Sequence, residues 1–197
     1  MIKYHRFFTM ALFLGLWVLG ACAQKTVSRI DPNAQIDLSG RWNDVDSRLV
    51  AEAMGKDALE GRWLRNYVLD NDKQPVMIVG MIQNKSHEHI QAETFIKDME
   101  REFIGSQKIR VVQNSRLREK LRQERIEQQE FASGDTQKKF GKELGADFML
   151  FGNISSIVDQ EGKKRVIYYQ INLELANIET NELVWIGEKK IKKFVKN

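Results

Sequence analysis

The chain of 197 residues contains one cysteine, two prolines and three histidines. A single cysteine excludes an intrachain disulfide, so the fold must be held by its hydrophobic core. Catalysis needs a nucleophile or an acid–base group with an orienting partner, and two histidines outside the N-terminal segment supply little of either. Gly152 and Gly187 stand alone, which gives no glycine pattern for cradling a phosphate. We therefore expect a protein that is not an enzyme and needs no cofactor.

One short cluster of histidines is the exception to this scarcity. His87 and His89 flank Glu88 at a predicted junction of loop and helix, and imidazoles with a carboxylate can bind zinc and other transition metals. Residues two apart do not share a helix face, however, and no later histidine or cysteine completes a site. We interpret the cluster as helix-start or surface residues and expect no metal.

No apolar run is long enough to span a membrane, which takes roughly 20 apolar residues. A shorter run from Phe7 to Val18 follows a charged start and precedes Leu-Gly-Ala-Cys, which ends at Cys22. These three parts predict a signal peptide over residues 1–21. Leu-Gly-Ala-Cys resembles the lipobox of bacterial lipoproteins, so we expect acylation of Cys22, as with palmitate, and two or more acyl chains anchor stably. The alternative is an ordinary secretory leader.

After Cys22 the sequence is polar and unpatterned to residue 37, which predicts a lipidated N-terminus and short tether over residues 22–37. The tether reaches at most about 50 Å when extended. Ala23, rather than Asp, follows the cysteine and indicates sorting to the outer membrane, with the domain facing the periplasm. The whole chain has 31 basic and 27 acidic residues. Removal of the leader takes away two basic residues and leaves the mature chain nearly neutral, so we expect no nucleic-acid partner.

The pattern of apolar residues predicts one α/β domain over residues 38–197, with helices packed on a mixed β-sheet. In chain order it predicts a helix capped by Asp46, a helical stretch around Trp63, a strand over 76–82, a loop over 83–86, a helix from about Glu88 to Gly105 and a strand over 109–112. The continuous apolar run at 76–82 is expected at the centre of the sheet. The order of strand, helix and strand favours a parallel crossover.

The second half of the chain changes character twice. A very polar helix is expected from Ser115 to about Glu130, and a shorter one over 136–144. A period of two then predicts a C-terminal antiparallel meander with turns at 159–162 and 179–182. Lysines near the C-terminus are typical of a guarded sheet edge. The alternative for these lysines is an anionic partner, such as lipid headgroups within reach of the tether.

Three stretches resemble the LpoB family of penicillin-binding-protein activator lipoproteins: VMIVGMIQNKS, ELGADFMLFGNI and YYQINLELANIETNELVWIGE. The resemblance implies a domain similar to the N-terminal domain of TolB and related to the curli secretion lipoprotein CsgG. It also implies an outer-membrane lipoprotein that activates a class A penicillin-binding protein, a bifunctional peptidoglycan synthase of the inner membrane. Such activators reach across the periplasm on a long Pro-rich segment, whereas this chain has a tether of about fifteen residues. The alternative function is an envelope adaptor or secretion-accessory lipoprotein that does not act on a synthase.

Docking residues are expected where exposed charge lies beside the apolar scaffold. The candidates are the loop Asn84-Lys85-Ser86 and three arginines of the polar helix, Arg116, Arg118 and Arg122. Long charged side chains can steer and orient a partner. The alternative is a solvated helix whose charges pair with one another.

Overall fold

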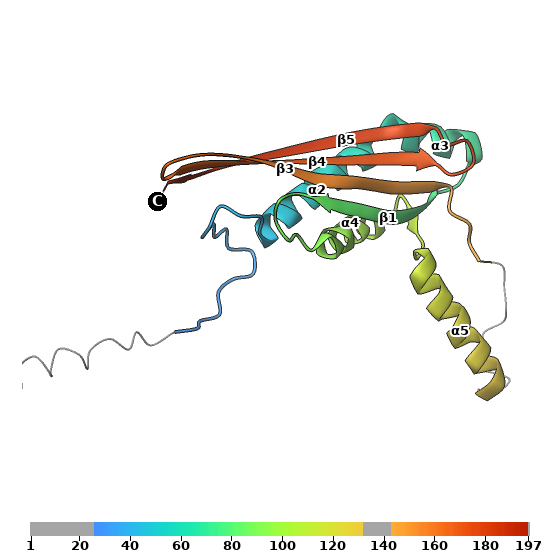
Figure 1. Cartoon of the computed structure of the whole chain (residues 1–197). Coiled ribbons are helices and arrows are strands. Elements are labelled where there is room, and N and C mark those ends of the chain that lie inside the picture. Colours follow the sequence, from blue (N-terminus) through green and yellow to red (C-terminus); the bar gives the residue numbers. More distant parts are fainter. Residues whose placement is uncertain (1–25, 132–142, 197) are drawn as a thin grey trace, which may run out of the picture. The chain divides into compact units, whose positions relative to one another are not determined.

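The computed structural model describes residues 26–131 and 143–196 (Figure 1). Cys22 and the signal peptide lie outside the described residues, as does most of the helix expected over 136–144, whose last residues are not helical. The chain divides into two units, Met1–Ala34 and Gln35–Asn197, and the second contains the helices and strands named below. No described helix is both long and apolar enough to cross a membrane.

The second unit begins with two consecutive helices, α2 (Asp44–Glu60) and α3 (Arg62–Asn71). The prediction that Asp46 caps the first helix is wrong by three residues. Asn43 is the N-cap, and its side chain accepts the Asp46 N–H at 3.0 Å while the Asp46 carboxylate accepts the Asn43 N–H at 3.0 Å. This reciprocal pair is a capping box, in which Asp46 holds the third helical position.

Five strands form one sheet in the order β2-β1-β3-β4-β5. Their bounds are β1 Val76–Lys85, β2 Arg110–Val111, β3 Phe148–Glu161, β4 Lys164–Asn177 and β5 Leu183–Lys196. β1 pairs in parallel with β2 and β3, whereas β3, β4 and β5 form an antiparallel meander. The predicted α/β class, the parallel pairing and the meander are therefore confirmed.

Three details of the sheet differ from the predictions. β1 lies inside the sheet, but the central strand is β3, because the meander places two strands on the far side of it. The predicted loop over 83–86 is wrong for its first three residues, since β1 continues to Lys85 in register with β3. The turn expected at 159–162 is shorter than predicted, since β3 continues to Glu161.

The described residues form two further helices, α4 (Ala92–Ser106) and α5 (Ser115–Phe131). α4 begins four residues after the expected start at Glu88, whereas the polar helix α5 lies where it was predicted. α2 and α4 pack against each other, α2 also against β5, and α4 against β1 and β2. In Figure 1 both helices lie on one side of the sheet.

The core lies between this pair of helices and the sheet. Phe95, Met99 and Phe103, one turn apart on α4, are fully buried, as helical periodicity predicts. The odd positions of β4 from Ile167 to Leu175 are also fully buried, whereas the even positions between them are only partly buried. The second face of the sheet, called the open face below, is therefore covered by neither α2 nor α4.

Candidate functional site

The predicted docking loop is the end of β1 and the turn that follows it. Asn84 and Lys85 are the last residues of β1, and Ser86 begins a bend. The Asn84 Nδ2 donates to the Glu88 carbonyl oxygen at 2.7 Å, and the Ser86 Oγ donates to the Asn84 Oδ1 at 2.6 Å. Two of the three predicted docking side chains are therefore engaged within the turn itself.

Glu88 forms a buried junction next to this turn. Its side chain is 11% exposed and accepts hydrogen bonds from the Trp42 backbone N–H at 3.0 Å and from the Tyr169 hydroxyl at 2.9 Å. The Trp42 and Tyr169 rings also meet edge to face, with centroids 5.5 Å apart. Burial and the nearby carboxylate raise the pKa of Tyr169 well above its usual value. The sequence pattern predicts a helix start at Glu88 and gives no local signal of this role.

Lys193 forms a second junction between β5 and the start of the domain. Its side chain is 12% exposed, and its ammonium lies 2.6 Å from Asp46 and 2.7 Å from Asp37. It also donates to the Arg41 carbonyl oxygen at 3.1 Å. Burial by itself lowers the pKa of Lys193. The two carboxylates raise this pKa by more than burial lowers it, so the net shift is upward. β5 is the edge strand, as predicted, yet this one of its lysines binds α2 rather than facing solvent.

The contact between Asp37 and Lys193 makes stability depend on pH. The hydrogen bond from Lys193 lowers the pKa of Asp37 below its usual value of 3.8. A lowered carboxyl pKa stabilises the fold above the pKa of the unfolded chain, and this contribution is lost as the pH falls through the folded-state pKa. We expect Asp37→Asn to lower Tm at pH 7 and to have a smaller effect at about pH 3, measured by circular dichroism. Equal effects at the two pH values would contradict this assignment.

The predicted arginines of α5 do not form one group. The Arg122 guanidinium donates to both Glu143 oxygens, at 2.8 and 2.9 Å, and to Glu119 at 3.1 Å. The Arg125 Nη2 lies 2.6 Å from the same Glu143. These hydrogen bonds lower the pKa of Glu143 to about 2. Arg122 therefore links α5 to the segment before β3 and is already paired within the chain.

Arg116 and Arg118 line a groove of about 610 Å³ between α4, α5 and β1, called the α5 groove below. Apolar side chains from three elements also line it: Ile78, Met81, Ile96 and Met149. Met81 is 67% exposed. The Arg118 Nε is buried and has no hydrogen-bond partner among the described residues, and Arg116 lies 3.9 Å from Glu93, with both side chains largely exposed. The groove thus combines apolar side chains with charged residues of both signs, namely Arg116, Arg118, Lys97, Glu93 and Glu100.

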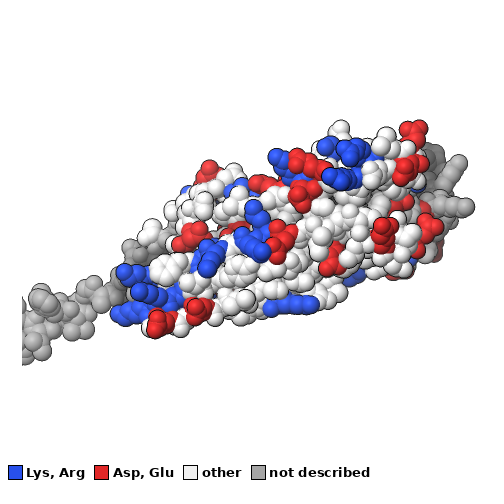
Figure 2. Space-filling view, turned by 90° about the horizontal axis from the view of Figure 1, so that it is seen from above, with Lys and Arg blue, Asp and Glu red and all other residues white. Residues whose placement is uncertain are grey.

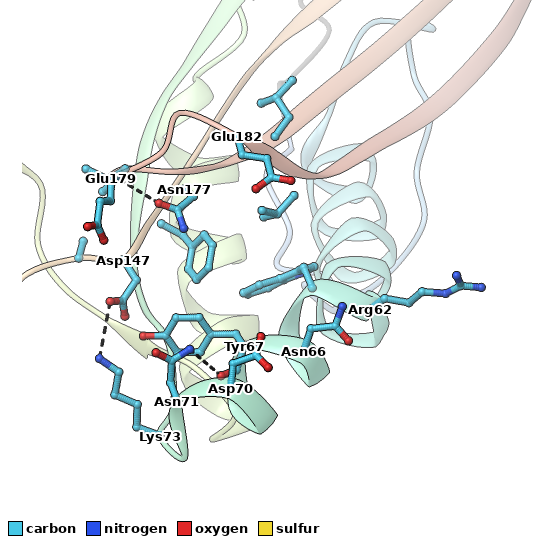
Figure 3. Close-up of a pocket in the computed structure, with 16 residues that line it drawn as sticks. Arg62, Asn66, Tyr67, Asp70, Asn71, Lys73, Asp147, Asn177, Glu179 and Glu182 are labelled. Atoms are coloured by element: carbon cyan, nitrogen blue, oxygen red, sulfur yellow. Dashed lines mark hydrogen bonds and ion pairs between the residues drawn. The ribbon is translucent and has the colours of Figure 1, made fainter.

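A second cavity of about 710 Å³, called the end pocket below, lies where β3 begins and β4 ends (Figure 3). Trp63 and Tyr67 of α3 meet the Phe148 ring edge to face, with centroids 5.1 and 5.3 Å away. Figure 3 shows Lys73 and Asp147 on the same side of Tyr67. The Asp147 carboxylate accepts the Val76 N–H at 2.8 Å and lies 3.9 Å from the Lys73 ammonium.

The rim of the end pocket is mostly acidic. Burial raises the pKa of Tyr67, whose hydroxyl oxygen is buried without a hydrogen-bond partner among the described residues. The charged lining residues are Arg62, Asp70, Lys73, Asp147, Glu179 and Glu182. The lining of this pocket comes from segments far apart in the chain. No local sequence pattern joins them, so the pocket could not be predicted from the sequence.

The histidine cluster is spread over the turn before α4. The His87 Nδ1 lies 2.5 Å from the Ser156 Oγ, which also accepts the His87 backbone N–H at 3.0 Å. The His89 Nε2 lies 3.1 Å from the Gln91 Nε2. Within residues 26–131 and 143–196, no three potential ligands are grouped closely enough to hold a metal ion. The contact with Ser156 instead fixes the turn against β3.

These residues define a small α/β domain with one helix-covered sheet face and surface grooves on either side of the start of β3. The family model described as peptidoglycan-synthase activator LpoB matches residues 46–191. The chain therefore belongs to the LpoB family, and the resemblance seen in the sequence is confirmed. The match runs from the first turn of α2 into β5.

The chain is also similar to several solved structures of low sequence identity. The LpoB C-terminal domain from Escherichia coli is 14% identical, with a TM-score of 0.40 over 75% of this chain and 99% of that one. The NMR structure of E. coli LpoB is 12% identical, with a TM-score of 0.41 over 89% of this chain and 82% of that one. Lipoprotein GNA1162 from Neisseria meningitidis is 12% identical, with a TM-score of 0.40 over 62% and 84%. No curated protein matches the chain.

Proposed function

We propose that this protein is an outer-membrane lipoprotein, anchored through acylated Cys22, that binds and activates a class A penicillin-binding protein and so regulates peptidoglycan synthesis. The observation that carries the proposal is the family match over residues 46–191. The competing function as a secretion-accessory adaptor has no comparable support. The lipobox-like sequence at Cys22 supports the anchor and a domain that faces the periplasm.

We propose the α5 groove as the place where the synthase docks. Interfaces place apolar contacts at their centre, and arginine is among the residues enriched there. The exposed Met81 supplies such a centre, and Arg116 and Arg118 line the groove beside it. The docking segment of the synthase is then expected to carry a carboxylate beside an apolar side chain.

Activation follows from a difference in affinity. A bound partner shifts a conformational equilibrium only as far as it binds one conformation more tightly than the other. The lipoprotein therefore activates by holding the synthase in the conformation whose surface fits the groove. The factor by which the equilibrium shifts toward that conformation equals the ratio of the lipoprotein's affinities for the two conformations. No chemistry by the lipoprotein itself is required.

Charge reversal at Arg118 tests the docking site. We expect Arg118→Glu to weaken binding of the synthase about tenfold, which is typical for loss of one well-placed interface residue. Crosslinking in cells and titration with the purified synthase measure the loss. Arg65→Glu is the matched control, because Arg65 is an exposed arginine on the separate helix α3. Reversal of Arg122 is less informative, since it also breaks the ion pair with Glu143. Unchanged binding by Arg118→Glu would remove the groove from consideration.

The function itself is tested with purified residues 23–197 and the class A synthases of the same organism. We expect the lipoprotein to raise both the glycosyltransferase and the transpeptidase rates. If neither rate changes and crosslinking recovers only outer-membrane or secretion components, the family fold stands and the proposed function is wrong.

A further inference from the structure

The far ends of β3, β4 and β5 carry a cluster of apolar side chains on the open face. Ile157 pairs with Tyr168, and Val166 pairs with Phe194. Residues that pair directly, or lie two apart along a strand, share a face of the sheet, so these four side chains form one patch, called the tip patch below. Ile157 and Phe194 are 65% and 63% exposed. Contiguous exposed apolar patches are typical of surfaces that bind a protein, a membrane or a ligand.

Basic residues surround the tip patch. The charged residues of this end of the sheet are Lys163, Lys164, Arg165, Lys192, Lys193, Lys196, Asp159 and Glu161. Lys164 pairs with Lys196, and Lys192 pairs with Tyr168, so these lysines share the face of the patch. Figure 2 shows basic side chains gathered at the left-hand end of the domain, where Figure 1 places the turn between β3 and β4. Asp159 pairs with Val166 and Glu161 pairs with Lys164, so these two carboxylates share the face as well. The patch is therefore apolar at its centre, with a charged rim in which lysines outnumber carboxylates by three to two.

The chain enters the domain at this same end. Asp37 contacts Lys193 of β5, the Ser39 carbonyl oxygen accepts from the Arg165 guanidinium at 3.3 Å, and Gly40 lies against the Val195 side chain. Cys22 precedes Gln35, the first residue of this unit, by about 13 residues. Such a segment spans at most about 45 Å when extended and on the order of 20 Å as a flexible coil.

We propose that the tip patch rests on the anionic phospholipid surface of the membrane to which Cys22 is attached. The inference rests on the anchor in the proposed function. The apolar side chains enter the interface, and the lysines bind phospholipid headgroups, which is how amphipathic surfaces bind anionic membranes. A lipid surface suits this patch better than a synthase does, because the short tether begins at the same end of the sheet and holds that end close to the membrane.

This contact fixes which end of the domain faces the partner. The strands β3, β4 and β5 are each 14 residues long, which corresponds to about 45 Å at roughly 3.3 Å per residue. The end pocket and the α5 groove both include residues at the start of β3, Phe148 and Met149 respectively. With the tip on the membrane, both cavities point into the periplasm, where a synthase can reach them.

Vesicle binding by the unlipidated chain tests this contact. The buried core lies between Val50 and Leu175, so residues 23–197 retain it. We expect them to sediment with vesicles of equal parts phosphatidylethanolamine and phosphatidylglycerol, and at least tenfold less with phosphatidylcholine vesicles. The double variant Ile157→Ser/Phe194→Ser should bind about tenfold more weakly, and each of Lys164→Gln, Lys192→Gln and Lys196→Gln should cost on the order of fivefold.

Matched variants at the opposite end provide the control. Ile186 and Leu183 are 67% and 53% exposed near the start of β5, so Leu183→Ser/Ile186→Ser should bind vesicles as the unchanged chain does. Equal loss in both double variants, or no binding by the unchanged chain, overturns the proposal. The proposal is also overturned if the tip variant still binds vesicles but no longer self-associates or no longer binds the synthase, because the patch is then a protein interface. The assay uses neither the anchor nor the synthase, so it can succeed or fail independently of palmitate labelling at Cys22 and of synthase activation.

Discussion

Replacing Gly152 by alanine is expected to lower the free energy of unfolding by about 3 kcal/mol, at the upper end of the range for overpacked sites. Gly152 lies in the central strand β3, opposite Leu173 of β4. A β-carbon at this position would lie 2.7 Å from the Leu173 Cδ2, 3.0 Å from its Cα, and against the Asn172 carbonyl oxygen. Because two of these three atoms are backbone, a rotamer change cannot relieve the overlap, and the strands must move apart.

Thermal and urea unfolding measure the effect of Gly152→Ala. A loss of about 3 kcal/mol corresponds to a fall in Tm of about 6–12 °C for a domain of this size. Gly105→Ala is the matched control, because Gly105 lies in α4 and a β-carbon there meets no other atom within 4 Å. It should change stability by less than about 0.5 kcal/mol, because Gly105 is the next-to-last residue of α4 and the larger gain on replacing glycine belongs to a helix interior. If Gly152→Ala is as stable as the unchanged chain, the sheet is more adaptable than the packing indicates.

Gly152 also shows where reading the sequence reaches its limit. In the sequence Gly152 stands alone and so gives no phosphate-binding glycine pattern. Its role in packing depends on β4, and the register of β4 against β3 is defined only in the folded sheet. The strands of the meander could be predicted because alternation of apolar and polar residues is a local signal. The same holds for α5, whose polar composition and helical length are both local. The central position of β3 was missed, since the order of strands depends on how the chain returns to the sheet.

The candidate site was predictable to a similar extent. Arg116 and Arg118 were selected for their charge and do line a groove, whereas Arg122 is paired with Glu143 from a segment 21 residues later in the sequence. Asn84 was assigned to a loop because the strand pattern weakens after Ile82. Pairing with β3 extends β1 to Lys85, and the Asn84 side chain donates a hydrogen bond to the Glu88 carbonyl oxygen in the turn that follows. Charge can therefore be located from sequence, but whether a charged group is free to dock cannot.

Replacing Glu88 by alanine is expected to destabilise the domain by about 2–5 kcal/mol. The Glu88 carboxylate accepts the Trp42 N–H and the Tyr169 hydroxyl, and Tyr169 is fully buried. Each buried donor left without an acceptor costs about 1–3 kcal/mol. The loss should also loosen the start of the domain, because Trp42 immediately precedes the N-cap of α2. Urea unfolding measures the change, and Glu93→Ala, which alters a largely exposed glutamate, should stay within about 0.5 kcal/mol.

A double-mutant cycle separates this network from simple loss of packing. Tyr169→Phe removes one donor but leaves the Trp42 hydrogen bond to Glu88, so by itself it should cost less than Glu88→Ala. In the Glu88→Ala background the same change removes a hydroxyl that already lacks its acceptor, and replacing an unsatisfied buried donor by a carbon–hydrogen group can even be stabilising. The loss of stability in the double variant should therefore be about 1–3 kcal/mol smaller than the sum of the two single losses. A coupling of this size indicates residues in contact or in one hydrogen-bond network. Additive losses would mean that Glu88 and Tyr169 stabilise the domain independently, and that the buried carboxylate is not the junction joining the start of the domain to β4.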